Sequence, residues 1–285
     1  MRNTSEATLD GKRVLITGAA RGIGAALGKR LTDRGAQVAL AGLEPEMLEA
    51  TAESIGAPWW PLDVADRAQV QGVVDQAAET LGGLDVVVAN AGVAAQLPIV
   101  GGDPDIFSST FAVNVFGTYN TLRAAGRHIS HPSGYALVIS SLGAIVNLPL
   151  LGAYSSSKAA VEALGNTLRQ ELRPYGAKAG VAYFAELDTD MTHRGWETEA
   201  ARHFLKGRHI SGVTPLSVGI DALERGITRR SRIVVAPGWV RAVIPIRPLA
   251  QRAMELRLRS GLAEVLEIAQ NEAVTLTTSQ PEHLL

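Results

Sequence analysis

Residues 13–24 read RVLITGAARGIG, a short apolar run that ends in a glycine-rich turn. An amphipathic stretch follows from Ala25 to Arg34, so the turn joins a strand to a helix. Glycines at 18, 22 and 24 leave backbone N–H groups at the start of that helix and no Cβ atoms in front of them, which a dinucleotide pyrophosphate requires. The spacing differs from G-x-G-x-x-G, and on the turn alone the glycines could serve only strand-to-helix packing, which is the lesser alternative.

Short apolar runs alternate with longer amphipathic stretches as far as residue 185. We expect strands at these ranges, with helices between them: 13–17, 37–41, 85–90, 135–140 and 179–185. Strands that are apolar almost throughout suit a parallel sheet covered on both faces, and parallel pairing needs crossovers of helical length. The sequence therefore predicts an α/β fold, a single-domain Rossmann-type doubly wound parallel sheet with helices on both faces over residues 1–236.

Composition limits the classes of function. The chain has 285 residues, 46% of them hydrophobic, which is enough for a sizeable core. A net charge of -1 argues against a nucleic-acid partner, because nucleic acid needs a strongly basic face. The absence of cysteine excludes disulfides and thiolate sites, and we expect no metal site. With no apolar run of the roughly 18 residues that a membrane span needs, and no export signal, we expect a cytoplasmic protein acting on a small molecule.

Residues 237–285 differ from the rest of the chain. Between Val240 and Gln270 five arginines lie among valine, isoleucine, leucine and methionine, a basic amphipathic pattern that fits no further strand-helix unit. We expect an extra C-terminal helical tail that packs on the domain or on a neighbouring subunit. Contact with a membrane surface is the alternative.

Two further motifs belong to the same edge of the predicted sheet. Asp63-Val64 follows the third strand position, where the carboxylate could accept from an adenine amine or cap a helix that begins near Ala65. Asn90-Ala91-Gly92 closes the fourth strand with small residues, where a ligand could approach the backbone. A plain turn would explain the second motif as well.

Tyr154 and Lys158 are four residues apart in a helical segment, so their side chains share one face. A phenol has an ordinary pKa near 10, and a neighbouring ammonium could lower it by about 2 to 3 units. Ser141, at the end of the fifth strand, could hydrogen-bond a substrate oxygen. Asn114 lies in an apolar helix expected over 106–129 and needs partners, so it could hold a backbone carbonyl and a water chain beside Lys158. A lone Tyr-x-x-x-Lys pair, however, commonly lies on a helix surface.

A family resemblance rests on these motifs in this order: Thr17-Gly-x-x-x-Gly22-x-Gly24, Asn90-Ala-Gly92, Asn114, Ser141 and Tyr154-x-x-x-Lys158. Over about residues 10 to 236 the chain resembles the short-chain dehydrogenase/reductase (SDR) family of NAD(P)-dependent oxidoreductases. The resemblance implies that Tyr154 is the general acid/base and that Lys158 lowers its pKa and binds the nicotinamide ribose. It also implies that Ser141 polarises the carbonyl, that Asn114 supports a proton relay, and that hydride moves between nicotinamide C4 and a substrate carbon.

The resemblance also implies a set of cofactor contacts: Thr17, Gly18, Arg21, Gly22, Ile23, Gly24, Gly42, Leu43, Asp63, Val64, Asn90, Ala91, Gly92, Tyr154, Lys158, Leu187 and Thr189. The chain departs from the family pattern where Phe184-Ala185 replace the usual Pro-Gly. NAD-preferring members carry Asp at the place of Gly42, and many NADP-preferring members carry Arg at the place of Leu43. Arg21 could pair with a 2′-phosphate, whereas Glu44 would oppose it by turning inward, and we favour NADP(H) over NAD(H).

Residues 191–214 lack a strand or helix pattern and mix Trp196, Phe204 and Ile210 with charge, which is typical of a mobile lid. Four apolar residues, Leu142, Val146, Leu148 and Leu150, lie between Ser141 and Tyr154. They could be core residues; together with the lid they predict an apolar pocket for a lipophilic secondary alcohol or ketone.

The function predicted is therefore an NAD(P)(H)-dependent oxidoreductase, in the family's usual homodimer or homotetramer. One alternative is a 3-oxoacyl thioester reductase, whose phosphopantetheine carrier could meet these basic residues: Arg194, Arg202, Lys206 and Arg208. The other alternative is a non-catalytic cofactor-binding sensor or scaffold. The complete set of Tyr154, Lys158 and Ser141 argues against it, because a scaffold does not need all three.

Overall fold

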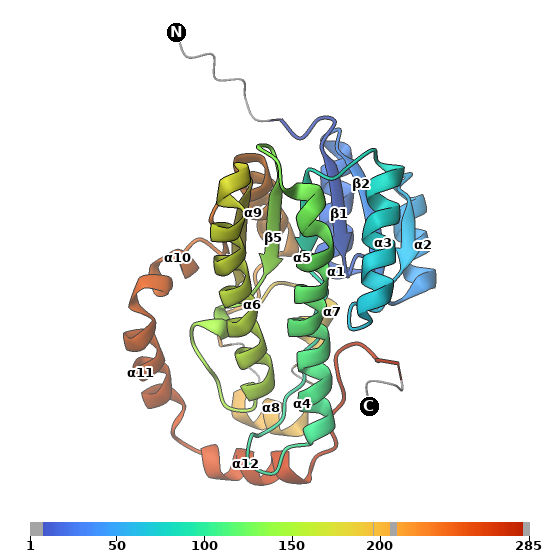
Figure 1. Ribbon diagram of the computed structural model, residues 1–285. Helices are drawn as coiled ribbons and strands as arrows, with labels where there is room; N and C mark the ends of the chain where they lie inside the picture. The colour runs from blue at the N-terminus through green and yellow to red at the C-terminus, as the bar shows by residue number, and fades with distance from the viewer. Residues whose placement is uncertain (1–7, 196, 206–209, 282–285) are drawn as a thin grey trace.

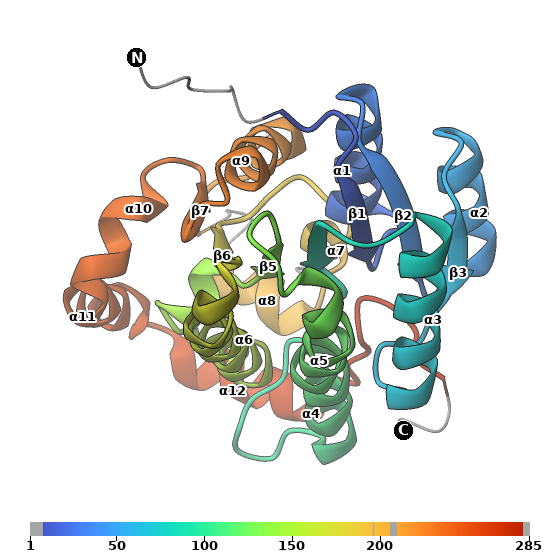
Figure 2. The same cartoon turned by 45° about the horizontal axis from the view of Figure 1, so that its top comes forward.

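The computed structural model describes residues 8–195, 197–205 and 210–281. Their centre is a seven-stranded parallel sheet in the order β3-β2-β1-β4-β5-β6-β7 (Figures 1 and 2). The strands are β1 (Arg13–Thr17), β2 (Gln37–Gly42), β3 (Trp59–Pro61), β4 (Val86–Ala89), β5 (Tyr135–Ile139), β6 (Lys178–Phe184) and β7 (Ile233–Ala236). The predicted doubly wound Rossmann-type sheet is confirmed, and the five strands with predicted ranges, β1, β2, β4, β5 and β6, end within one residue of expectation. No range was predicted for β3 or β7.

Two layers of helices cover the sheet. On one face lie α1 (Gly22–Asp33), α2 (Pro45–Glu53) and α9 (Leu216–Arg229), which share one buried apolar cluster. The other face carries α3 (Arg67–Thr80), α5 (Thr118–Ile129) and α6 (Gly152–Glu171), which share a second cluster. The helix α4 (Pro104–Phe111) precedes α5, and its Ile106 packs with Ala153 of α6 in a smaller cluster. Every residue of β4 and β5 is buried, as a parallel sheet between two helical layers requires.

The helix expected over 106–129 contains a local change of winding. A π-helical segment, Ala112–Gly117, joins α4 to α5 without a break in the chain direction. Single π-helical turns inside α-helices occur frequently at functional sites. Asn114 lies inside this segment.

The tail consists of α10 (Val240–Val243), a short 3₁₀ turn, α11 (Arg247–Leu258) and α12 (Leu262–Asn271), which run around the outside of the domain (Figure 2). It packs on its own domain: Arg247 of α11 pairs with Glu162 of α6 at 2.8 Å, and Asn147 donates its backbone N–H to Gln251 at 2.7 Å. Among the described residues, none of the helices has the length and apolar character that crossing a membrane requires.

The segment 191–214 is not the patternless loop that the sequence suggests, because it contains most of α7 (Asp190–Gly195) and all of α8 (Glu199–Leu205). The tail provides the reason. Ala200 of α8 is buried with Val265 of α12, and the Glu272 carboxylate accepts from the Ala200 N–H at 3.0 Å at the start of α8. A short helix held by such distant partners has no local periodicity to reveal it. Trp196, Lys206 and Arg208 lie outside the described residues.

Candidate active site

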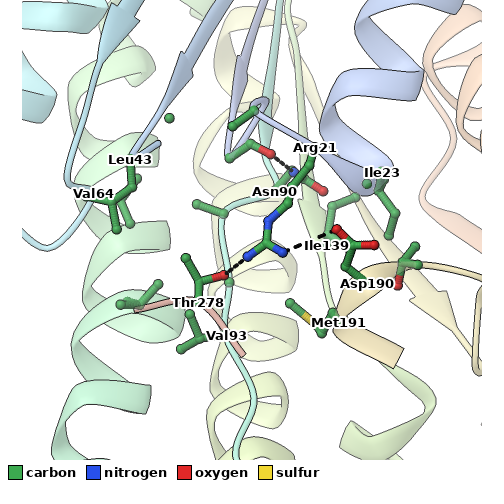
Figure 3. Close-up of a pocket in the computed structure, with 18 of the residues that line it drawn as sticks. Arg21, Ile23, Leu43, Val64, Asn90, Val93, Ile139, Asp190, Met191 and Thr278 are labelled. Atoms are coloured by element: carbon green, nitrogen blue, oxygen red, sulfur yellow. Dashed lines mark hydrogen bonds and ion pairs between the residues drawn. The ribbon is translucent and has the colours of Figure 1, made fainter. Parts of the chain in front are cut away.

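A pocket opens where the carboxyl ends of β1, β4, β5 and β6 meet (Figure 3). Its lining brings together most of the residues proposed for the cofactor and the chemistry: Gly18, Arg21, Gly22, Ile23, Gly42, Leu43, Asp63, Val64, Asn90, Ala91, Gly92, Ser141, Tyr154, Lys158, Leu187 and Thr189. The other three proposed residues, Thr17, Gly24 and Asn114, lie behind this lining and act on it through hydrogen bonds or close packing.

The glycine turn has the backbone that its sequence predicts. Gly18 and Gly22 have φ of +64° and +57°, which glycine adopts without strain. A Cβ atom at Gly18 would lie 2.6 Å from the Ala91 Cα, and one at Gly24 would lie 2.8 Å from the Asn90 side-chain nitrogen. The turn is therefore a cradle that side chains would fill, and it fits the pyrophosphate of a dinucleotide at the N-terminus of α1.

Thr17 and Asn90 hold this cradle from behind. The Asn90 side chain donates to the backbone oxygens of Thr17 at 3.0 Å and of Gly18 at 2.9 Å. The Asn90 backbone N–H donates to Thr17 Oγ1 at 3.2 Å. The Asn-Ala-Gly motif is thus more than a turn, because its amide ties the end of β4 to the end of β1.

Asp63 lies in the pocket lining and does not cap α3. That helix begins at Arg67, and its N-cap is Asp66, whose carboxylate accepts from the N–H groups of Ala68 and Gln69. Asp63 Oδ1 instead accepts from the Ala65 N–H at 2.9 Å, and the residue lines the pocket beside Leu62 and Val64. The capping alternative for Asp63 is therefore wrong, and its contact with an adenine amine stays a prediction.

Tyr154 and Lys158 share one face of α6, as their spacing predicts. The Lys158 Nζ lies 5.8 Å from the centre of the Tyr154 ring and donates to the Ile139 carbonyl at 3.0 Å. Lys158 is buried, and burial lowers its pKa to about 8. Desolvation favours the neutral form of both side chains, the amine of Lys158 and the phenol of Tyr154.

The predicted lowering of the Tyr154 pKa is wrong for this arrangement. Burial raises the pKa of the Tyr154 phenol, and the hydrogen bond with Ser141 acts in the opposite direction. The Lys158 Nζ lies 5.8 Å from the centre of the Tyr154 ring and bonds the Ile139 carbonyl, and burial dominates the shift of the phenol pKa. The phenol therefore holds its proton at neutral pH. Ser141 also accepts from the Gly143 N–H at 3.0 Å, which fixes the direction of its hydroxyl.

Asn114 is fully buried in the π-helical segment and has the partners that burial demands. Its oxygen accepts from the Val93 N–H at 2.8 Å, and its nitrogen donates to the Val93 carbonyl at 2.9 Å and to Ser157 Oγ at 2.9 Å. Asn114 therefore positions the loop after β4 and joins it to α6, the helix that carries Tyr154 and Lys158. The backbone carbonyl it was expected to hold is that of Val93.

A second pocket adjoins the first and shares Ser141 and Tyr154 with it. Apolar side chains make most of its wall: Ala94, Leu142, Val146, Leu148, Leu151, Phe184, Ala185, Met191, Ile210 and Met254. Leu150 and Phe204, both expected here, pack instead with Ala200 and Val265 in a separate apolar cluster. Met254 comes from α11, and the sequence offered no signal that the tail would reach this wall.

Arg21 lies in the first pocket, but protein groups already surround its guanidinium (Figure 3). Its nitrogens donate to Glu44 at 3.0 Å, to Asp190 at 3.3 Å and to the Thr278 hydroxyl at 2.6 Å. Glu44 therefore does turn inward. Thr278 and Gln280 also line the pocket, and sequence reasoning missed both because they lie more than 250 residues from the glycine turn.

Comparison with known proteins places these features in one family. Residues 12–200 match the family described as short chain dehydrogenase. The chain is 36% identical over 175 residues to L-2,3-butanediol dehydrogenase of Corynebacterium glutamicum, covering 58% of this chain and 67% of that one. It is 34% identical over 195 residues to D-threitol dehydrogenase of Mycolicibacterium smegmatis, covering 66% and 75%.

Solved structures agree on the fold. A short chain dehydrogenase from Burkholderia cenocepacia, in complex with NADP, superposes with a TM-score of 0.74 at 23% identity, covering 88% of this chain and 98% of that one. A short chain dehydrogenase/reductase from Burkholderia phymatum, in complex with NAD, gives 0.73 at 24%, covering 87% and 96%.

Proposed function

The chain belongs to the short-chain dehydrogenase/reductase family of NAD(P)-dependent oxidoreductases, and on that premise we propose that it interconverts a lipophilic secondary alcohol and its ketone. One observation carries the proposal: Ser141 and Tyr154 stand where the dinucleotide pocket meets the apolar pocket. A substrate carbon held there would lie beside a nicotinamide and within reach of a phenol proton.

The bound nicotinamide supplies or accepts the hydride, and this chain's residues handle the proton. Tyr154 donates a proton to the substrate oxygen during reduction, and its raised pKa keeps that proton in place at neutral pH. Ser141 hydrogen-bonds the same oxygen. Lys158, buried beside the Tyr154 ring, holds the nicotinamide ribose. This assignment favours ketone reduction near pH 7 and alcohol oxidation at alkaline pH.

The apolar wall supports a lipophilic substrate. Ten of the lining side chains are apolar, and they reach from Leu142 after β5 to Met254 on α11. Polar groups are few: Gln96, Ser141, Tyr154, Glu186, Thr192 and Ser211. Butanediol and threitol, the substrates in the names of two relatives, are small and hydroxylated. We expect this chain to prefer ketones with a larger apolar body, because each buried methylene contributes about 0.8 kcal/mol.

For the cofactor we propose NADP(H) in preference to NAD(H). Arg21 supplies the positive charge, and Gly42 leaves out the carboxylate that would repel a 2′-phosphate. Glu44 opposes this preference, because a phosphate at Arg21 has to take the place of the Glu44 carboxylate. Once the 2′-phosphate has replaced the Glu44 carboxylate, it pairs with the Arg21 guanidinium.

Fluorescence titration of NADPH and NADH tests the preference. Arg21→Ala should weaken NADPH by about tenfold to a hundredfold more than NADH, the value of a charge-assisted contact. Gly42→Asp should favour NADH; the new Cβ would lie 3.4 Å from the Ala19 and Ala20 nitrogens, a contact that a small shift accommodates. A wild-type preference for NADH, or an unchanged ratio in Arg21→Ala, would contradict the proposal and point to Glu44 or a backbone group as the ribose partner.

We also propose a homo-oligomer that pairs through α4 and α5. Three aromatic side chains are exposed along α4, the π-helical segment and α5: Phe107 by 40%, Phe116 by 59% and Tyr119 by 48%. Clustered exposed apolar side chains of this kind are typical of a protein-protein contact. The tail helix α11 lies against α6, where Arg247 pairs with Glu162. Because α11 already occupies that part of α6, we expect the subunit interface to lie on the α5 side. Light scattering should give at least twice the 30.1 kDa chain mass, and Phe116→Glu should reduce the measured mass.

A screen of both reduced cofactors against apolar ketones, small hydroxyketones and 3-oxoacyl thioesters tests the substrate class. We expect turnover to rise with the apolar size of the ketone. A higher rate with thioesters would replace the proposal with the thioester reductase. Cofactor binding without turnover of any compound would indicate the non-catalytic sensor or scaffold.

A further inference from the structure

Residues 272–280 leave α12 and run back toward α7 (Figure 1). Two of them, Thr278 and Gln280, line the first pocket. We propose that this segment, the strap, is part of the cofactor site and retains the dinucleotide by closing over it. The proposal rests on the proposed function, since it assumes that the first pocket holds a nicotinamide dinucleotide.

The strap is clipped to the loop that follows β4. Thr277 is buried; its N–H donates to the Ala94 carbonyl at 2.9 Å, and its hydroxyl accepts from the Ala94 N–H at 3.0 Å. Residues 90–93, immediately before Ala94, line the first pocket. The clip therefore fixes the strap to the wall of the cleft rather than to a distant surface.

A second attachment joins the strap to the opposite side of the cleft. Arg21, in the glycine turn, donates to the Thr278 hydroxyl at 2.6 Å and to the Thr277 carbonyl at 3.3 Å. Arg194, on α7, donates to the same carbonyl at 3.4 Å. The strap thus bridges the loop after β4, the glycine turn and α7, three elements that surround the place expected for the pyrophosphate and nicotinamide.

The base of the strap is held independently of these bonds. Glu272 accepts from the N–H groups at the start of α8, and Val274 and Leu276 pack against Leu97 and Ile106. The strap can therefore lift at Thr277 and Thr278 while its base stays in place. Breaking a few hydrogen bonds at the tip costs far less than unfolding the segment.

The strap forms a wall of the cleft and does not fill it. Thr278 and Gln280 line the same pocket that extends from Leu43 and Val64 to Tyr154. A segment that filled the cofactor site would instead separate Leu43 and Val64 from Tyr154, and these residues would not line one pocket. The strap lies beyond residues 12–200, the part of the chain that matches the family model.

Stopped-flow displacement of bound NADPH and NADH, followed by fluorescence, tests the strap. The double variant Thr277→Val with Thr278→Val removes both hydroxyl contacts and keeps the β-branched shape. We expect its dissociation rates to rise at least tenfold for both cofactors. Thr228→Val is the matched control, because it removes a threonine hydroxyl that makes one hydrogen bond, to the Glu224 carbonyl on α9, outside both pockets. Its dissociation rates should equal those of the wild type.

The outcomes separate the strap from the function on which it rests. A wild-type chain that binds neither cofactor would overturn both proposals. A wild-type chain that binds while the double variant keeps its dissociation rates would overturn the strap alone. Faster association with unchanged dissociation in the variant would show that the strap competes with the cofactor, and would equally overturn retention. Arg21→Ala should accelerate the release of both cofactors, because it loses the contact with Thr278. The loss of the 2′-phosphate contact is measured separately, as a change in the ratio of the NADPH and NADH dissociation constants.

Discussion

Replacement of Lys158 by methionine should change how stability depends on pH, because burial lowers the Lys158 pKa from 10.5 to about 8. Below pH 8 the lysine is protonated in both folded and unfolded chains, and the folded state bears the cost of the buried charge. Between pH 8 and 10.5 the folded state binds fewer protons than the unfolded state, so the lysine's contribution to stability rises with pH. For these two pKa values the rise from pH 7 to 10 is about 2 to 3 kcal/mol.

Urea unfolding of wild type and Lys158→Met at several pH values measures this effect. The difference between the two proteins isolates Lys158, because other titrating groups contribute equally to both. Methionine keeps most of the volume but loses the hydrogen bond to the Ile139 carbonyl, a loss that is constant with pH while the amine remains bonded. The free energy of unfolding of the wild type, relative to that of the variant, should therefore rise by about 2 to 3 kcal/mol between pH 7 and 10. A difference that stays constant over this range would refute the account of a desolvated Lys158.

Further predictions concern the turn, the proton donor and the buried amide. Gly24→Ala should lower the free energy of unfolding in urea by about 1 to 3 kcal/mol and abolish cofactor binding, because the new Cβ would meet the backbone of the glycine turn. The control Gly72→Ala has open space around the new Cβ and should do neither. Tyr154→Phe removes the proton donor and should lower kcat at least a hundredfold while leaving the cofactor Kd within threefold. The control Tyr175→Phe, at an exposed tyrosine, should change neither value. Asn114→Ala should cost about 2 to 4 kcal/mol in urea unfolding through three lost hydrogen bonds, and a loss under about 1 kcal/mol would contradict the positioning role.

The sequence predicted the parts of the site that depend on local spacing. The glycine turn could be placed because strand, glycines and helix follow one another within residues 13–34. Tyr154 and Lys158 could be placed on one face because the helical period relates residues four apart. Asn90 and Ser141 could be placed at one edge because the carboxyl ends of parallel strands lie together.

Other features could not be predicted, because they depend on contacts between distant segments. The strap meets Arg21 across more than 250 residues, and α8 is stabilised by the tail rather than by its own pattern. The π-helical winding at Asn114 has no signal in a window of apolar residues. The direction of the Tyr154 pKa depends on how deeply the phenol is buried and on where the Lys158 amine points, and spacing alone determines neither.

A single-turnover reaction tests the central claim most directly. Wild-type chain loaded with NADPH, or with NADPH deuterated at the transferred position of C4, is mixed with an apolar ketone, and the absorbance of the reduced nicotinamide is followed. The account predicts a decay that the deuterated cofactor slows and that Tyr154→Phe loses although it still binds NADPH. Undiminished absorbance in wild type with every ketone, or a wild-type rate in Tyr154→Phe, would contradict it.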